Sequence, residues 1–298
     1  MQVTKPNLRL VLKNILFTTD FTPASEAALP YVTALARWYG SKVVVVHSVE
    51  PEPILNMPME PIPQDMDYNW RTAERKMDDF LLSHPLEGVA HETLLLQGDL
   101  WEVISEVVRR HEIDLLVLGT HGREGIKKLV MGSAAEQIFR RATCPVLTVG
   151  PKIAGASVGF ETWKRILFAT DFSSGSLGAI PYALSLAEEN QAALTLLHLI
   201  SLVPMQREEF VIEAARKRLE LLVPLEAAAW CNPEFVVQVG FPAEGILRVA
   251  KEHGADLIVM GVHTPRSARA STHLPWAIAH EVVCHAHCPV LTVRGVSF

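Results

Sequence analysis

Cysteine and long apolar runs are both scarce in this chain. Only four of its 298 residues are cysteine, at positions 144, 231, 284 and 288, which is too few and too irregular for a disulfide framework. No apolar run approaches the roughly 18 residues of a membrane span. The N-terminal MQVTKPNLRLVLKN also lacks the apolar core and cleavage site of a secretion signal. The sequence therefore predicts a cytoplasmic protein with no membrane segment.

Positive charge and catalytic motifs are scarce as well. Lys and Arg total 27 against 33 Asp and Glu, for a net charge of -6, and no basic stripe is present. A general nucleic-acid partner is therefore not expected. The chain has no Gly-Lys-Ser/Thr phosphate loop and no readable Ser-His-Asp, paired-carboxylate or metal-water constellation. We accordingly predict no catalytic residues.

What the chain does have is a copy of itself. NILFTTDF at 14–21 recurs as RILFATDF at 165–172, DLLVLG at 114–119 as DLIVMG at 256–261, and CPVLTV at 144–149 as CPVLTV at 288–293. The matching segments occur in the same order in both copies, but the number of residues between matching segments changes along the chain. Insertions and deletions in the intervening loops would cause this change. This indicates an internal duplication with one domain per copy. We assign residues 1–150 to copy one and 160–298 to copy two, with a linker between them.

Short Val-, Ile- and Leu-rich runs alternate with helical stretches in copy one. Continuous apolar runs of this length are typical of parallel strands that are covered on both faces. The alternation predicts an α/β fold with a doubly wound parallel sheet in each copy. Pro30 and Pro181 fall in the first helix of each copy and predict a kink or a late helix start. The expected strands of copy one are 14–19, 43–49, 91–96, 114–118 and 145–149.

One glycine pattern in copy one is typical of a site that binds an anion. Gly119-x-x-Gly122 is followed, after nine residues, by Gly132-Ser133, between a buried strand and a helix. Glycines let backbone N–H groups approach an anion, and the helix N-terminus adds a partial positive charge. The Arg and Lys residues at 123, 127 and 128 could add charge. Each piece alone also has a structural interpretation, as a turn or a helix cap.

Asp20, which ends the first strand, is a second candidate at the same edge of the sheet. Its structural alternative is that it caps the following helix, and Asp171 keeps the residue in copy two. Copy two lacks the glycine pattern, because Thr264 replaces Gly122 and either Leu274-Pro275 or Trp276-Ala277 replaces Gly-Ser. We therefore expect copy two not to bind the ligand.

The two ILF-x-TDF starts, the LGTHGR segment at 118–123, the glycine spacing and the two CPVLTV strands together resemble the universal stress protein family. The resemblance is to its tandem two-domain form and covers nearly the whole chain. It implies two five-stranded Rossmann-like domains packed through their last strands as an intramolecular pseudo-dimer; further homo-oligomerisation stays open. It also implies ATP, with Mg²⁺ as a further option, with Asp20 near the adenine or ribose, Ser48 beside the base, and the phosphates on Gly119, Gly122, Gly132, Ser133 and the amide of Ala134.

Three functions follow as hypotheses. The first is a nucleotide-responsive stress or regulatory binding protein with an unidentified protein partner. The second is a structural or interaction module whose glycine loop is vestigial or takes another ligand. The third is a slow ATPase.

Three other features of the sequence have a structural interpretation beside a functional one. The segment Pro51–Pro63 holds five prolines and predicts a loop that could serve as a lid. His280, Cys284, His285, His287 and Cys288 crowd together, with an i, i+4 pair that could grip zinc. Because Cys288-Pro289 repeats Cys144-Pro145, which has no such histidines, we predict no metal site. His47 and His198 end equivalent strands, which favours a structural role.

Overall fold

The computed structural model describes residues 10–49, 68–120, 131, 133–153, 160–201, 207–262 and 275–294. Four features named above lie outside these residues: Gly122 and Gly132, the loop cations at 123, 127 and 128, the segment Pro51–Pro63, and the residues Thr264 and Leu274. Trp276 lies inside a described helix, but its side chain is not described.

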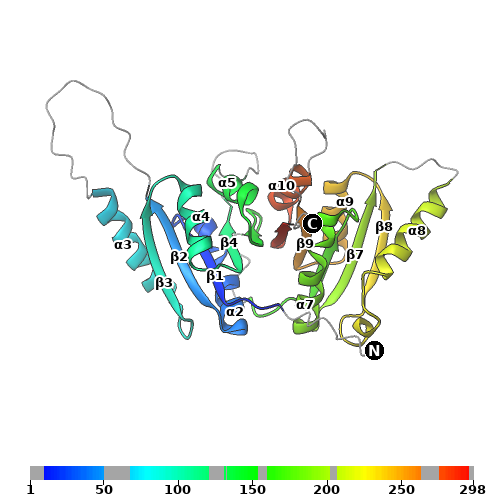
Figure 1. The fold of residues 1–298 in the computed structure, drawn as a ribbon, viewed down its shortest axis with the longest axis horizontal. Coiled ribbons are helices and arrows are strands. Elements are labelled where there is room, and N and C mark those ends of the chain that lie inside the picture. The colour runs from blue at the N-terminus through cyan, green and yellow to red at the C-terminus, as the bar shows by residue number, and fades with distance from the viewer. Residues whose placement is uncertain are drawn as a thin grey trace, which may run out of the picture.

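The described strands form a single ten-stranded sheet in the order β3-β2-β1-β4-β5-β10-β9-β6-β7-β8 (Figure 1). All pairs within each copy are parallel, which confirms the predicted α/β class with two tandem parallel-sheet domains. The strands are β1 Asn14–Thr18, β2 Lys42–Val49, β3 His91–Gln97, β4 Leu115–Gly119, β5 Val146–Val149, β6 Arg165–Ala169, β7 Ala193–Ile200, β8 Glu234–Val239, β9 Leu257–Val262 and β10 Val290–Arg294.

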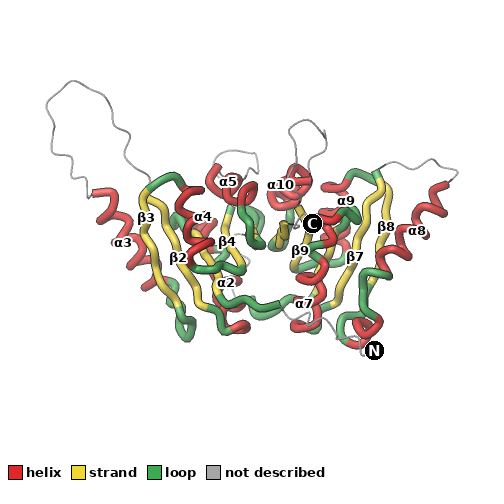
Figure 2. The backbone as a smooth tube through the Cα atoms, in the orientation of Figure 1, coloured by secondary structure: helices red, strands yellow, loops and turns green. Residues whose placement is uncertain are grey.

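Helices cover both faces of this sheet, as the tube in Figure 2 shows. One apolar cluster joins α2, α3, α7 and α8 to one face, and a second joins α4, α5, α9 and α10 to the other. Alternate residues of β1 enter different clusters: Ile15 and Phe17 the first, Leu16 the second. The helices are α1 Pro23–Glu26, α2 Leu29–Tyr39, α3 Tyr68–Ser83, α4 Leu100–Arg110, α5 Ser133–Arg141, α6 Ser174–Leu177, α7 Ile180–Asn190, α8 Glu208–Glu220, the 3₁₀ helix η2 Leu225–Ala229, α9 Pro242–Glu252 and α10 Pro275–His285.

The two prolines mark a late helix start. Pro30 and Pro181 occupy the first turn of α2 and α7, where the missing N–H costs no intrahelical bond. The short helices α1 and α6 precede them and are capped by Thr22 and Ser173, whose side chains accept from the backbone N–H of Ser25 and Ser176.

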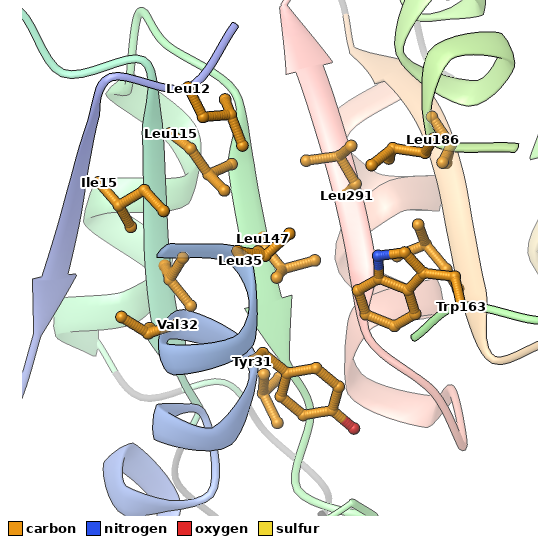
Figure 3. Packing of buried hydrophobic residues seen from close by; sticks show 14 of the residues in the cluster. Leu12, Ile15, Tyr31, Val32, Leu35, Leu115, Leu147, Trp163, Leu186 and Leu291 are labelled. Carbon is orange, nitrogen blue, oxygen red and sulfur yellow. The ribbon is translucent and has the colours of Figure 1, made fainter. Parts of the chain in front are cut away.

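The copies join through β5 and β10, which pair antiparallel with Leu147 opposite Leu291. The Thr292 hydroxyl also donates to the Val146 carbonyl at 3.3 Å. Around this pairing, apolar side chains from both copies meet, with Leu147 facing Leu291 in Figure 3. The expectation that the copies pair internally through their last strands is therefore confirmed.

Trp163, which precedes β6 in copy two, packs against copy one. Its ring stacks on Tyr31 of α2 with centroids 5.5 Å apart. The side chain is 1% exposed, and its indole Nε1 has no partner among the described residues. The indole therefore serves the contact between copies through its apolar area and not through a hydrogen bond.

No helix in the described part of the chain is long and apolar enough to cross a membrane.

Trp163→Ala is expected to lower the free energy of unfolding by about 3–5 kcal/mol, because it opens a cavity between the copies. Urea unfolding followed by circular dichroism measures this loss. Trp38→Ala is the control: Trp38 is 44% exposed, so its truncation should cost much less. Equal losses in the two variants would contradict the assignment of Trp163 to the joint between the copies.

Candidate functional site

A cleft of about 1370 Å³ opens in copy one at the carboxyl ends of β1, β2 and β3. Open α/β sheets bind ligands at this edge. Asp20 and Ser48 line the cleft from the strand side, and Asp99 lines it from the start of α4. Helices α3 and α5 contribute Lys76, Arg140 and Arg141. Two of the residues predicted from the sequence, Asp20 and Ser48, therefore share one cavity.

Asp20 has a structural task as well as a place in the cleft. Its Oδ1 accepts hydrogen bonds from the Thr22 backbone N–H at 3.1 Å and the Thr22 hydroxyl at 2.6 Å. Thr22 in turn caps α1. Asp171 accepts the same two bonds from Ser173 in copy two. The carboxylate thus orders the strand-to-helix turn in both copies, and in each copy the Asp also lines a hollow, the large cleft in copy one and a much smaller one in copy two.

Gly119 is required by packing, whatever the ligand. A Cβ added to this residue would lie 1.9 Å from the Ala24 carbonyl oxygen of α1. Gly261 meets the same constraint in copy two, where its Cβ would lie 2.2 Å from the Gly175 carbonyl oxygen. Gly119 is also not among the described residues that line the cleft. Its retention in both copies therefore follows from the approach of α1 and α6.

Ser48 and His47 end β2 beside the cleft. The Ser48 hydroxyl donates to the Gly98 carbonyl at 3.4 Å. His47 Nδ1 lies 2.8 Å from the Thr19 carbonyl, and the ring lies 4.4 Å from that of Phe21. His198 repeats both contacts in copy two, with Thr170 and Phe172. This duplication supports the structural interpretation of both histidines.

Helix α5 begins at Ser133, directly after the predicted glycine pattern. Ser133 and Ala134 lie in its first turn, although their side chains are not described. Ala135, Ile138 and Phe139 are buried against the sheet. The other side of the helix faces the cleft and carries Glu136, Gln137, Arg140 and Arg141.

Sequence reasoning missed the cations of the cleft. Arg140 and Arg141 could have been predicted from the sequence, because they lie on the polar side of a helix that starts at the glycine pattern. Lys76 could not have been predicted, since nothing in the sequence indicates that α3 passes the end of β2. Asp99 carried the signal of a helix cap, and its Oδ1 does accept from the N–H groups of Trp101 and Glu102.

A family model described as "Universal stress protein family" matches residues 12–150 and again residues 162–294. The chain belongs to the universal stress protein family.

Relatives of this universal stress protein match one copy or both. A universal stress protein of Methanocaldococcus jannaschii is 25% identical over 161 residues, which is 49% of this chain and 99% of the relative. Universal stress protein A homolog 1 of Coxiella burnetii is 31% identical over 142 residues, which is 47% of this chain and 97% of the relative. A solved universal stress protein of Archaeoglobus fulgidus covers 95% of this chain and 98% of its own, with a TM-score of 0.70 and 18% identity. That likeness shows a shared fold across both copies.

In copy two of this universal stress protein, a hollow of about 90 Å³ lies at the carboxyl ends of β6 and β7, where Asp171 and Leu199 line it. Leu199 stands where copy one has Ser48, and a Cβ on Gly245 of α9 would lie 2.4 Å from the Leu199 Cδ1. Gly245 takes the place of Val103 in copy one. The larger residue on the strand is therefore matched by a smaller residue on the facing helix, and Leu199 forms part of the wall of the hollow.

The histidines and cysteines near α10 do not gather around one point. His280 Nε2 lies 3.9 Å from the Cys284 Sγ, and Cys284 is buried. Among the residues that the structure describes, no group of three or more His, Cys, Asp or Glu could hold a metal ion.

Gly119→Ala and Gly261→Ala should each lower the free energy of unfolding by about 1–3 kcal/mol, because both force a backbone contact apart. Urea unfolding of the two single variants provides the comparison. If Gly119→Ala left stability unchanged while Gly261→Ala lowered it, a packing role for Gly119 would be wrong.

Acid should destabilise the protein through His47 and His198. Burial lowers the pKa of both imidazoles, so the unfolded chain binds protons at a higher pH than the folded one. Their contribution to stability is complete above the unfolded pKa of about 6.5 and is lost as the pH falls through the folded value. Urea unfolding between about pH 7 and pH 5 should show this loss. The double variant His47→Asn, His198→Asn should lose less stability over the same range, and an unchanged slope would contradict the prediction.

Proposed function

We propose that copy one binds ATP or a closely related nucleotide, with Mg²⁺, and that occupancy regulates the contacts of this universal stress protein with a partner in a stress response. The observation that carries the proposal is the spacing Gly119-x-x-Gly122, nine residues, Gly132-Ser133, which leads into a helix beside an open cleft. The proposed nucleotide contacts are Asp20, Ser48, Gly119, Gly122, Gly132, Ser133 and Ala134.

The charges around the cleft support a phosphate-bearing ligand. Lys76 of α3 and Arg140 and Arg141 of α5 line the cavity from two directions. Asp20, Asp99 and Glu136 line the same cavity, and Glu136 lies 3.4 Å from Arg140. An anion would therefore be attracted locally to the α3 and α5 walls and not by a net positive charge of the whole cavity. The first turn of α5 adds unpaired backbone N–H groups and the positive end of the helix dipole. Mg²⁺ would enter with the phosphates, as it commonly does at sites that offer few protein ligands.

Asp20 and Ser48 suit the nucleoside end of the ligand. The bonds from Thr22 to Oδ1 fix the Asp20 carboxylate at the edge of the cleft, where it can accept from ribose hydroxyls or the adenine amino group. Ser48 lies at the end of the neighbouring strand, where its backbone can flank the base. In this arrangement the nucleoside lies over the strand ends and the phosphates extend toward α5.

Copy two serves as a partner that does not bind nucleotide. Leu199 fills the place of Ser48, and the cations of α5 are replaced on α10 by Cys284 and His285. The second copy therefore has a smaller hollow and lacks the two cations of α5, while it keeps one cation on α8, Arg218, which lies 3.9 Å from the Phe172 ring centroid.

Isothermal titration of ATP with Mg²⁺, into protein whose bound nucleotide has been removed and checked by chromatography, tests the proposal. One site per chain is expected. Lys76→Gln should weaken binding severalfold, because it removes a cation from the cleft wall. Arg75→Gln is the matched control: it removes an exposed cation from the same helix, outside the cleft. The double variant Gly132→Val, Ser133→Val should abolish binding.

The alternative functions are outcomes of the same experiment. No binding and no co-purified nucleotide would overturn the proposal in favour of an interaction module. Phosphate release that is lost in the Gly132→Val, Ser133→Val variant would show a slow ATPase at the same site. Two sites per chain would contradict the assignment of copy two.

A further inference from the structure

Helix α5, which carries two of the cleft cations, is held by copy two at its C-terminal end. Arg294 is the last residue of β10, and its Nη2 donates to the carbonyl oxygen of Arg140. The last carbonyls of a helix have no intrahelical partner and form the negative end of the helix dipole. A guanidinium from copy two thus caps the helix that lines the cleft of copy one.

The strand register explains why this arginine reaches α5. β10 runs antiparallel to β5, with Val290 opposite Thr148 and Thr292 opposite Val146. Continuing this register places Arg294 opposite Cys144, three residues past the end of α5. The Arg294 Nε is buried and has no partner among the described residues, so the side chain gives up hydration in this position. The hydrogen bond from Nη2 to the Arg140 carbonyl oxygen offsets part of this loss of hydration.

Copy two also touches the residue that leads into α5. Met131, which is buried, lies two positions before Ser133 and belongs to the same apolar cluster as Cys284 of α10. Burial raises the pKa of the Cys284 thiol, and a hydrogen bond from the Met131 backbone opposes that rise. The entry and the exit of α5 are therefore both in contact with the second copy.

The corresponding position at the end of α10 is built differently. Gly150 takes the place of Arg294 in copy one, and a Cβ there would lie 2.6 Å from the Val283 carbonyl oxygen of α10. The cation that reaches the end of α10 is Lys152, whose Nζ donates to the His285 carbonyl at 3.0 Å. Each helix end thus receives one cation from the other copy, but only α5 lines the large cleft.

We propose that Arg294 is a positioning residue of the cleft in copy one, holding α5 and its cations in place across the joint between the copies, so that the site is incomplete without copy two. The proposal rests on the proposed nucleotide function for its affinity test. It gives copy two, which lacks a site of its own, a direct part in binding.

Titration of ATP with Mg²⁺ into the full-length wild type, Arg294→Gln, Arg294→Lys and Lys152→Gln tests this role. Arg294→Gln should weaken binding about fivefold, which corresponds to about 1 kcal/mol. Arg294→Lys keeps a cation within reach of the Arg140 carbonyl and should recover most of the affinity. Lys152→Gln, the matched control, removes the corresponding bond at α10 and should leave affinity unchanged.

Wild-type affinity in Arg294→Gln would overturn the proposal. Equal weakening in Lys152→Gln would overturn it too, because the effect would then belong to the joint in general and not to α5. A failure of Arg294→Lys to recover affinity, with stability restored, would also count against the proposed mechanism.

Hydrogen exchange on nucleotide-free protein separates this inference from the proposed function. Arg294→Gln should speed amide exchange in the last turn of α5 and leave α10 unchanged, while Lys152→Gln should do the reverse. If wild type bound no nucleotide, the proposed function would fail, and this pattern would still decide whether Arg294 holds α5. Unchanged exchange in α5 would overturn the inference whatever the titration gave.

Discussion

The antiparallel pairing of β5 with β10 is the constraint on which the rest of the molecule depends. It converts two five-stranded sheets into one, buries Leu147 against Leu291, and brings Trp163 onto Tyr31. A short strand such as β5 would otherwise be an open edge that invites pairing with another molecule. Because the partner strand is in the same chain, that edge is closed without a second molecule.

The two copies share a fold but differ in the hollow at the ends of their strands. Both copies keep the Asp that orders the first turn, the His that contacts the strand end, and the Gly that admits the short helix. What changes includes the residue at the end of the second strand, the residue that faces it on the helix, and the two cations of α5, whose places Cys284 and His285 take on α10. Leu199 and Gly245 take the places of Ser48 and Val103, and Leu199 packs against Gly245. The duplicated features therefore maintain the fold, and the features that differ accompany the difference in size between the two hollows.

Much of the fold could be predicted because its signals are local or repeated. Apolar runs gave the strands of copy one to within a residue or two, and the repeated CPVLTV segments pointed to the strands that pair. The site was predicted less completely. Asp20 and Ser48 do share a cleft, but Gly119 has a packing reason that the sequence could not reveal. That reason is the approach of Ala24, 95 positions earlier in the chain, which no local pattern encodes.

The sequence by itself determined the duplication, the parallel α/β class and the restriction of the glycine pattern to copy one. Each of these follows from residue order or hydrophobic period, which need no knowledge of distant contacts. Only the tertiary structure decided which helices form the walls of the cleft, that Leu199 packs against Gly245 in copy two, and that Arg294 reaches Arg140. These depend on the crossover connections and on the register of β5 with β10, which bring together side chains that are far apart in the chain.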